Sequence, residues 1–279
     1  MYRPHFRIWT IASAAALCFA VPNVYAGSPD VTCGDTISGR GQLVGSCQGS
    51  ITILSGRLNL QGFTISGTGL AAIECLGSCR IEGPGAIVSN GSTFGISGND
   101  RVRLADVLVA GHDATGVKSG DFGRIRIDRS TITDNGIGVR GPRISIKDSE
   151  VSNNASSGIV STTRGVRALR TNIIDNGGDG IATVLTDDQA NRAKLIDVVV
   201  TGNGKFGVIA KNVNGRAATL EANRQDSACG TSEPCADVAS VNSPKLRHGT
   251  CEKSMRIPDE FTGPVPFGPP WGACDQDFN

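Results

Sequence analysis

Arginine recurs at intervals of about 20 residues through the middle of the sequence. The recurring residues stand near the start of successive β-rich stretches and are Arg80, Arg101, Arg124, Arg143, Arg164, Arg192 and Arg216. Stacked stretches would line these side chains into a ridge that can clasp the carboxylates or sulfates of an acidic polymer. The predicted substrate-binding residues are Arg101, Arg124, Arg143 and Arg164. The alternative is a solvated turn whose charge is neutralised by acids, among them Asp100, Asp121, Asp128 and Asp148.

Two adjacent carboxylates, Asp187 and Asp188, lie in the longest interval between repeats, "VLTDDQANR". Paired carboxylates can bind Ca²⁺ or divide the roles of general acid and base, and insertions in solenoids often crowd the functional face. Lys118 and Arg140 stand nearby on neighbouring repeats, where they could contact a substrate carboxylate. The candidate catalytic residues are therefore these four, and Asp187 with Asp188 are the candidate calcium ligands. A solvated loop is the alternative for the two acids.

The elements that must position these residues are short strands in a repeat. Segments such as "RIRIDRSTITDNGIGV" and "RISIKDSEVSNNASSGI" combine brief period-two alternation with a Gly followed by Ile or Val. These glycines are Gly95, Gly116, Gly136, Gly158, Gly180 and Gly207. Such strands are stable only when each lies beside its equivalent in the next coil, about 4.8 Å away. The repeat predicts an all-β fold, a single-stranded right-handed parallel β-helix (solenoid) of about seven coils with disulfide-closed ends.

One column of polar residues tests this alignment. Three residues after an apolar strand position come Asn90, His112, Asn135, Asn154, Asn176 and Asn203. Asn suits a recurring turn because it tolerates left-handed φ and can bond both the turn backbone and the Asn of the next coil. We expect His112 to be a substitution within this ladder rather than a catalytic base.

The first 26 residues have the layout of a secretory signal, and the apolar run from Ile8 to Val21 is shorter than the ~20 residues needed to cross a bilayer. An exported chain with eight cysteines after Ala26 favours disulfides over zinc, because no histidine stands at ligand spacing within the close cysteine pairs. The predicted pairs join sequence neighbours: Cys33 with Cys47, Cys75 with Cys79, Cys229 with Cys235, and Cys251 with Cys274.

The flanks differ from the repeats. Residues 27–50 predict an N-terminal cap, residues 51–222 the β-helix and residues 223–279 an irregular Cys- and Pro-rich tail that seals the other end. Composition agrees with this division, because 37 glycines exclude a helical bundle and 27 basic against 26 acidic residues exclude a generally basic nucleic-acid binder.

With "VTCGDTI" entering the repeats and "LNLQGFTISG" opening the first full coil, residues 31–222 resemble secreted right-handed parallel β-helix repeat proteins of the pectate-lyase-like superfamily. The resemblance implies a polysaccharide ligand and a site on one strand face. The galacturonase-like motif set is matched only by Asp187-Asp188, and the epimerase-like DPHE pattern is absent from the sequence. Fold alone does not carry a reaction.

These observations predict a secreted or periplasmic monomer that binds an extracellular or envelope polysaccharide of acidic type. We expect no membrane span and no nucleic-acid partner, and the paired acids point to Ca²⁺ as the candidate cofactor. The alternative function is a polysaccharide lyase or glycoside hydrolase acting on an acidic glycan.

Overall fold

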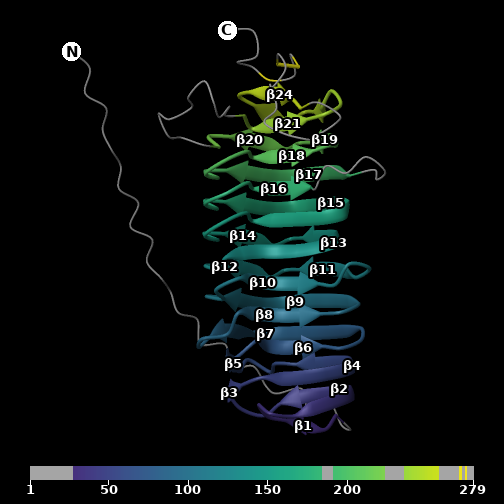
Figure 1. Cartoon of the computed structure of the whole chain (residues 1–279), viewed down its shortest axis with the longest axis vertical. Helices are drawn as coiled ribbons and strands as arrows, with labels where there is room; N and C mark the ends of the chain where they lie inside the picture. The colour runs from purple at the N-terminus through teal and green to yellow at the C-terminus, as the bar shows by residue number, and fades with distance from the viewer. Residues whose placement is uncertain (1–27, 184–190, 224–235, 258–269, 272–273, 275–279) are drawn as a thin grey trace, which may run out of the picture.

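The computed structural model describes residues 28–183, 191–223, 236–257, 270–271 and 274. The predicted leader, residues 1–26, lies outside them. The described strands form one 24-stranded sheet whose successive coils pair in parallel, and no helix occurs among these residues. The fold is an all-β parallel β-solenoid, as predicted, and Figure 1 shows its coils stacked along one long axis.

The strands up to residue 119 are β1 (Asp30–Val31), β2 (Thr36–Leu43), β3 (Cys47–Gly49), β4 (Ile51–Asn59), β5 (Thr64–Gly67), β6 (Ala71–Cys75), β7 (Cys79–Ser89), β8 (Phe94–Gly98), β9 (Arg101–Ala110) and β10 (Thr115–Ser119). The following strands are β11 (Arg124–Asp128), β12 (Thr131–Thr133), β13 (Ile137–Lys147), β14 (Glu150–Ser152), β15 (Ile159–Ile174), β16 (Ile181–Thr183), β17 (Arg192–Thr201), β18 (Val208–Ala210), β19 (Asn212–Arg216), β20 (Thr219–Glu221), β21 (Val238–Ser240), β22 (Lys245–Arg247), β23 (Thr250–Cys251) and β24 (Ser254–Arg256).

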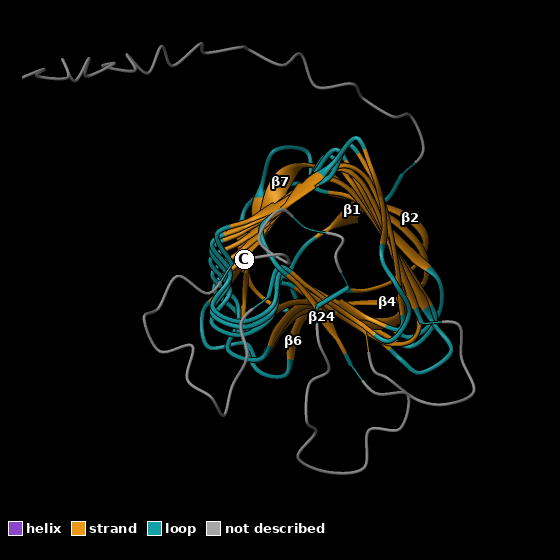
Figure 2. Cartoon of the chain, turned by 90° about the horizontal axis from the view of Figure 1, so that it is seen from above, coloured by secondary structure: helices purple, strands orange, loops and turns teal. Residues whose placement is uncertain are grey.

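Each coil has three faces, which give the solenoid the roughly triangular outline in Figure 2. We name them from one part of the chain: β10 lies on face C, β11 on face A and β12 on face B. Long strands turn a corner between faces; the first part of β13 pairs with β10 on face C and its last part pairs with β11 on face A. The solenoid has about eight turns rather than seven. The difference arises because β2 stacks in register on β4, and β24 on β21, at the two ends.

The core is built from the inward positions of these alternating strands. Ile125 and Ile127 on β11 pair in register with Ile144 and Ile146 on β13, and all four side chains are buried. Apolar residues therefore stack directly upon their equivalents in the next coil. Burial of each such side chain contributes on the order of 2 kcal/mol, which explains why strands too short to be stable alone persist here.

The asparagine column forms a continuous buried hydrogen-bond ladder after face B. The side-chain amide of each member donates to the side-chain oxygen of the next, at 3.1 Å for Asn135 to Asn154, 2.8 Å for Asn154 to Asn176 and 2.9 Å for Asn176 to Asn203. The ladder continues through Asn223 and ends at Asp237. The predicted bonding between coils is confirmed. The left-handed conformation, however, belongs to the residue before each Asn, as at Asp134, Asn153 and Asp175.

The ladder also explains the recurring glycine. A Cβ added at Gly138 would lie 2.9 Å from the amide nitrogen of Asn154 and 2.5 Å from the carbonyl oxygen of Gly158. Only glycine leaves room for the ladder at this position. Gly138, and not the predicted Gly136, occupies the column, because Val139 rather than Ile137 pairs with Val117. The sequence "NGIGV" offers two Gly-aliphatic pairs two residues apart, and alternation alone does not separate them.

Asn90 does not belong to the ladder, contrary to the prediction. It is exposed, and the buried side chain beside His112 is Ser92. The Nε2 nitrogen of His112 lies 3.3 Å from the carbonyl oxygen of Ile87, so it donates there, and Nδ1 accepts from the hydroxyl of Ser92 at 2.9 Å. Burial lowers the pKa of His112, which keeps the ring neutral. His112 is thus a structural end of the ladder, as predicted.

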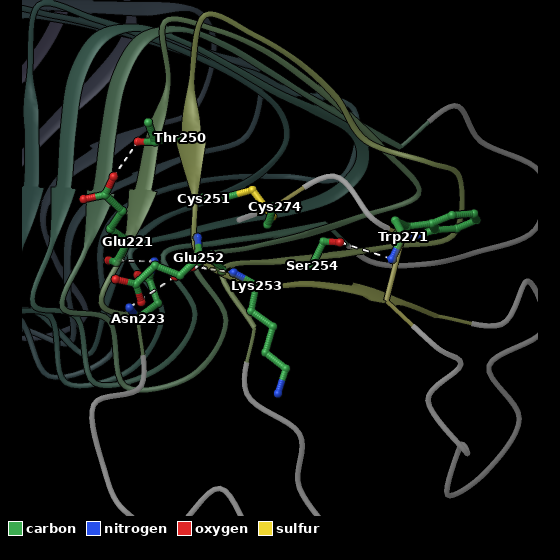
Figure 3. The surroundings of a disulfide bond; sticks show 10 residues. Glu221, Asn223, Thr250, Cys251, Glu252, Lys253, Ser254, Trp271 and Cys274 are labelled. Atoms are coloured by element: carbon green, nitrogen blue, oxygen red, sulfur yellow. Dashed lines mark hydrogen bonds between the residues drawn. A yellow bond between two sulfur atoms is a disulfide. The ribbon is translucent and has the colours of Figure 1, made fainter. Parts of the chain in front are cut away.

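Three predicted disulfide pairs are confirmed: Cys33–Cys47 and Cys251–Cys274 lie near the two ends of the solenoid, and Cys75–Cys79 joins β6 to β7 in an inner coil. The fourth pair, Cys229 with Cys235, lies outside the described residues. Figure 3 shows Cys274 joined to Cys251 at the last coil. Disulfides of this kind persist in oxidising compartments.

Trp271 lies against the same end of the solenoid. Its indole nitrogen donates to the carbonyl oxygen of Ser240, and its backbone nitrogen donates to the hydroxyl of Ser254.

In the described ranges, no helix has the length and apolar character to span a membrane.

Candidate functional site: the arginine face

The outward positions of face A carry basic side chains through most of the solenoid. We call these residues the arginine face: Arg40, Arg57, Arg80, Arg101, Arg103, Arg124, Arg126, Arg143, Arg167, Arg192 and Lys194. They form two columns. Arg101 pairs in register with Arg124, and Arg143 continues that column because it precedes Ile144, the partner of Ile125.

The second column is longer and runs two residues further along each strand. Register pairs join Arg40 to Arg57, Arg57 to Arg80, Arg80 to Arg103, and Arg103 to Arg126. Ser145 then interrupts the column, and Arg167 and Lys194 resume it. Each residue lies one strand spacing, about 4.8 Å, from its neighbours. Alternation causes both columns, since Val102 and Leu104 point into the core while Arg101 and Arg103 point out.

The interruption at Ser145 leaves a hollow of about 350 Å³ in the arginine face. Arg126 and Arg167 line it from the coils on either side of Ser145, and Lys147 and Asp128 lie at one edge. A small side chain between two guanidinium groups makes room for an acidic group that both can contact.

Like charges in this arrangement repel one another. The pKa of Arg124 is lowered, first by the charge of Arg143, then by partial burial, and then by the charges of Arg101, Arg126 and Arg164. Arginine remains protonated at any ordinary pH, so the face keeps its charge and its mutual repulsion. An anion bound there relieves that repulsion.

The acids that could neutralise this face bond elsewhere. Asp128 pairs with Arg129, Asp148 pairs with Arg170 and Lys147, and Asp100 accepts a hydrogen bond from Ser78. The pKa of Asp100 is lowered chiefly by that hydrogen bond, and to a smaller extent by the backbone amide and the charge of Arg101, with which it forms no ion pair. Asp121 forms no ion pair with any described residue. Glu82 is the exception, since it pairs with both Arg57 and Arg80 near the N-terminal end. Within the described ranges, no ion pair involves the central residues Arg101, Arg103, Arg124, Arg126, Arg143 and Arg167.

At the corner between faces A and B, by contrast, the arginines form ion pairs with acids. Asp106, Arg129, Asp148 and Arg170 follow one another on successive coils, all with positive φ. Arg129 donates to both carboxylate oxygens of Asp106 at 2.8 Å, and Arg170 donates to both carboxylate oxygens of Asp148 at 2.5 and 2.9 Å. The guanidinium of Arg170 holds the pKa of Asp148 at about 2. Acidic and basic residues alternate on successive coils at this corner, whereas basic residues stack on basic residues on the arginine face.

The structure thus brings Arg101, Arg124 and Arg143 together in one column. Arg164 lies one position out of register, because Gly165 is the partner of Arg143, although its charge still reaches Arg124. The longer column was missed in the sequence. Its signal is the two-residue spacing of basic residues in "RVRL", "RIRI" and "RAKL".

The candidate residues Lys118 and Arg140 lie on face C instead. They pair in register on β10 and β13 and line one pocket of about 720 Å³. The ammonium of Lys118 sits over the ring of Phe94, 3.8 Å from its centre. Asp121, Ser156 and Thr162 also line the pocket. The candidate residues Asp187 and Asp188 lie outside the described residues. In the part of the chain that is described, no cluster of three or more His, Cys, Asp or Glu is suited to a metal ion.

No protein-family model matches the chain, and no curated protein matches it. Two solved structures are similar in part. Full-length tailspike protein 2 from Escherichia coli O157:H7 bacteriophage CAB120 has 12% sequence identity and a TM-score of 0.49, over 76% of this chain and 35% of that chain. The Dettilon tailspike protein has 13% identity and a TM-score of 0.47, over 81% of this chain and 54% of that chain. The chain therefore spans about a third and about half of the two tailspike chains. Membership of the pectate-lyase-like superfamily stays a prediction.

Proposed function

We propose that this protein is exported and binds an acidic polysaccharide along its arginine face. The observation that carries the proposal is the register of the two basic columns, whose central arginines form no ion pair with described residues. Ion-paired arginines one corner away, Arg129 and Arg170, show that acids are placed where the fold needs neutral charge.

The form of the face suits an extended polymer. Positive groups repeat about every 4.8 Å along the axis, and about eight turns give a surface roughly 40 Å long. A polymer with an acidic group on successive sugar units can meet several guanidinium groups at once, and each guanidinium can bind a carboxylate through two parallel hydrogen bonds. Many weak contacts along one chain then combine through effective concentration.

Nucleic acid fits the face less well. No aromatic side chain stands at the described outward strand positions of face A, and the exposed ring nearest to them, Phe122, is a single one, whereas proteins that hold single strands stack successive bases on several aromatic rings. The whole chain carries a formal net charge of only +1, so it lacks the general positive charge that is typical of nucleic-acid-binding proteins. We therefore place the acidic group on a sugar polymer.

The experiment is retention of the purified protein on immobilised pectate, alginate and heparin, with a neutral glucan column as the reference. Substitution of Arg101, Arg124 and Arg143 together by Ala should weaken the retention, so that this variant leaves the acidic columns at clearly lower salt than the unaltered protein. A variant with Arg129 and Arg170 replaced by Ala loses two positive charges outside the face and should stay retained. Unchanged retention of the triple variant overturns the proposal.

A second candidate function is cleavage of the same class of glycan. It is favoured by the pairing of Lys118 with Arg140 in one pocket, where either could contact a substrate carboxylate, with Asp187 and Asp188 as proposed acid, base or calcium ligands. Incubation with pectate, alginate or glycosaminoglycan in the presence of Ca²⁺ tests it. Unsaturated or reducing ends support cleavage, and their absence with all three polymers contradicts it.

A further inference from the structure

The corner between faces C and A carries an aromatic side chain that packing does not explain. Phe122 is 91% exposed, the most exposed of the large hydrophobic side chains described. A phenylalanine in this position loses the free energy that burial would give it. Phe122 stands in the short turn between β10 and β11, where many polar residues would serve equally well.

Phe122 lies between two groups of basic residues. Within seven consecutive residues, "KSGDFGR", the chain passes from Lys118 in the face C pocket, through Asp121 at the pocket wall, to Phe122 and then Arg124 on the arginine face. The next coil repeats the crossing, with Arg140 in the pocket and Arg143 on the arginine face on either side of a buried Gly141–Pro142 corner. Cations therefore continue from one face to the next around a corner marked by an exposed ring.

The pocket itself is built to hold an anionic group. Lys118 and Arg140 stand on adjacent coils at one register position, and neither forms an ion pair with a described residue. The ring of Phe94 lies under the ammonium of Lys118, and this cation–π contact restricts the position of the ammonium. Phe94 therefore acts as a positioning residue. Ser156, Thr162 and Asp121 add hydroxyl and carboxylate groups that can bond sugar hydroxyls.

We infer that the face C pocket and Phe122 extend the polysaccharide site around the corner from the arginine face. The pocket takes a carboxylate-bearing sugar unit, with its acidic group between Lys118 and Arg140. Phe122 packs against the apolar face of the sugar ring that crosses the corner. This inference rests on the proposed function, since it supplies the second half of the same binding surface.

The test is titration calorimetry of the full chain with a galacturonate hexamer, a guluronate hexamer and the methyl-esterified galacturonate hexamer. Phe122→Ala should weaken binding of the acidic hexamer that binds best by about tenfold, and Phe122→Trp should restore it. The double variant Lys118→Ala with Arg140→Ala should weaken it at least as much, since it removes two charge-assisted contacts. The methyl-esterified hexamer should show no loss on the double substitution.

Leu108→Ala provides the control, because Leu108 is 37% exposed and pairs with Thr131 on face B, away from this corner and from the pocket. It should leave binding unchanged. The inference is overturned if Phe122→Ala and the double variant both bind within twofold of the unaltered protein while the Arg101, Arg124 and Arg143 triple variant loses binding. Loss of the proposed function looks different: the triple variant then binds as well as the unaltered protein, or the unaltered protein binds neither acidic hexamer.

Discussion

Asn154 and Asn176 stand one above the other in successive coils, and one oxygen of Asn176 accepts two hydrogen bonds from Asn154. The side-chain amide donates to Oδ1 of Asn176 at 2.8 Å and the backbone nitrogen donates to the same atom at 3.2 Å. The amide of Asn154 also donates to the carbonyl oxygens of Ile132 and Ser152. A single side chain therefore bonds three successive coils.

Asn154→Ala should cost about 3 kcal/mol of unfolding free energy, because it leaves buried carbonyl and amide groups on either side without partners. Denaturant unfolding measures this. Asn172→Ala is the control, since Asn172 is exposed on a neighbouring strand and should change stability by less than about 0.5 kcal/mol. A cost below about 1 kcal/mol at Asn154 would mean that the ladder contributes little.

Asn154→Asp replaces the hydrogen-bond-donating amide group with an accepting oxygen and leaves the size of the side chain almost unchanged. Above the pKa of the new carboxyl, the carboxylate oxygen that replaces the amide nitrogen faces the carbonyl oxygens of Ile132 and Ser152 and the Oδ1 of Asn176, so the variant should be more destabilised than Asn154→Ala at pH 7. Burial raises that pKa in the folded state, so the folded variant binds the proton more readily, and its stability relative to the parent should fall as pH rises from 4 to 7. A difference that is independent of pH would contradict this.

His112 should make stability fall on acidification. Its pKa is lowered in the folded state by burial, so the unfolded chain binds the proton first. The contribution is fully present above the unfolded value of about 6.5 and is lost as pH falls from there toward the lower folded pKa. The unfolding free energies of the parent and of His112→Asn, measured between pH 8 and pH 5, should diverge in slope, with the shallower slope in the variant. Parallel curves would show that His112 does not titrate between the two states.

Arg124 should oppose stability in the free protein. Its lowered pKa reflects repulsion, chiefly from Arg143, so Arg124→Gln should raise the melting temperature slightly at low ionic strength. The gain should disappear in 1 M salt, where charges are screened over about 3 Å. A melting temperature that drops at low salt would show that Arg124 has a stabilising partner. The same measurement establishes that lost binding in arginine variants does not come from unfolding.

The disulfide between Cys251 and Cys274 should stabilise the C-terminal end more than the one between Cys75 and Cys79. The first spans 23 residues and the second spans 4, so loop-closure entropy predicts about 3 against about 2 kcal/mol. Replacing each pair by Ala and comparing hydrogen exchange of β21 and β24 tests the order. Equal protection of these strands in both variants would contradict it.

The sequence predicts the repeat well because its causes are local. Alternation in "RIRI" and the glycine beside each ladder position act within one coil, and so do the neighbouring cysteine pairs. Exact register is harder, because it depends on how long each coil is. Asp237 follows Asn223 by only 14 residues, so the end of the ladder falls outside the period seen in the repeats.

In the candidate site, too, the residues that follow a local pattern were predicted, and those that depend on the register between coils were not. Arg101, Arg124 and Arg143 were found because each begins the stretch of its coil that lies on face A: Arg101 and Arg124 open β9 and β11, and Arg143 follows the corner within β13. Arg103 and Arg126 look like ordinary surface residues until the pairing of β9 with β11 and of β7 with β9 places them in a column with Arg80. Nor does the sequence show which acids pair with which arginines. Asp148 is close in sequence to Arg143, yet it bonds Arg170 from the next coil.

The most direct measurement is the salt dependence of binding to a long acidic polysaccharide such as pectate. Each released counterion steepens the fall of the logarithm of the binding constant with the logarithm of salt concentration. We predict a steep fall for the unaltered protein and for the variant lacking Arg129 and Arg170, and a fall shallower by about three ions for the variant lacking Arg101, Arg124 and Arg143. An equal slope in all three proteins would contradict the assignment of the arginine face as the binding surface.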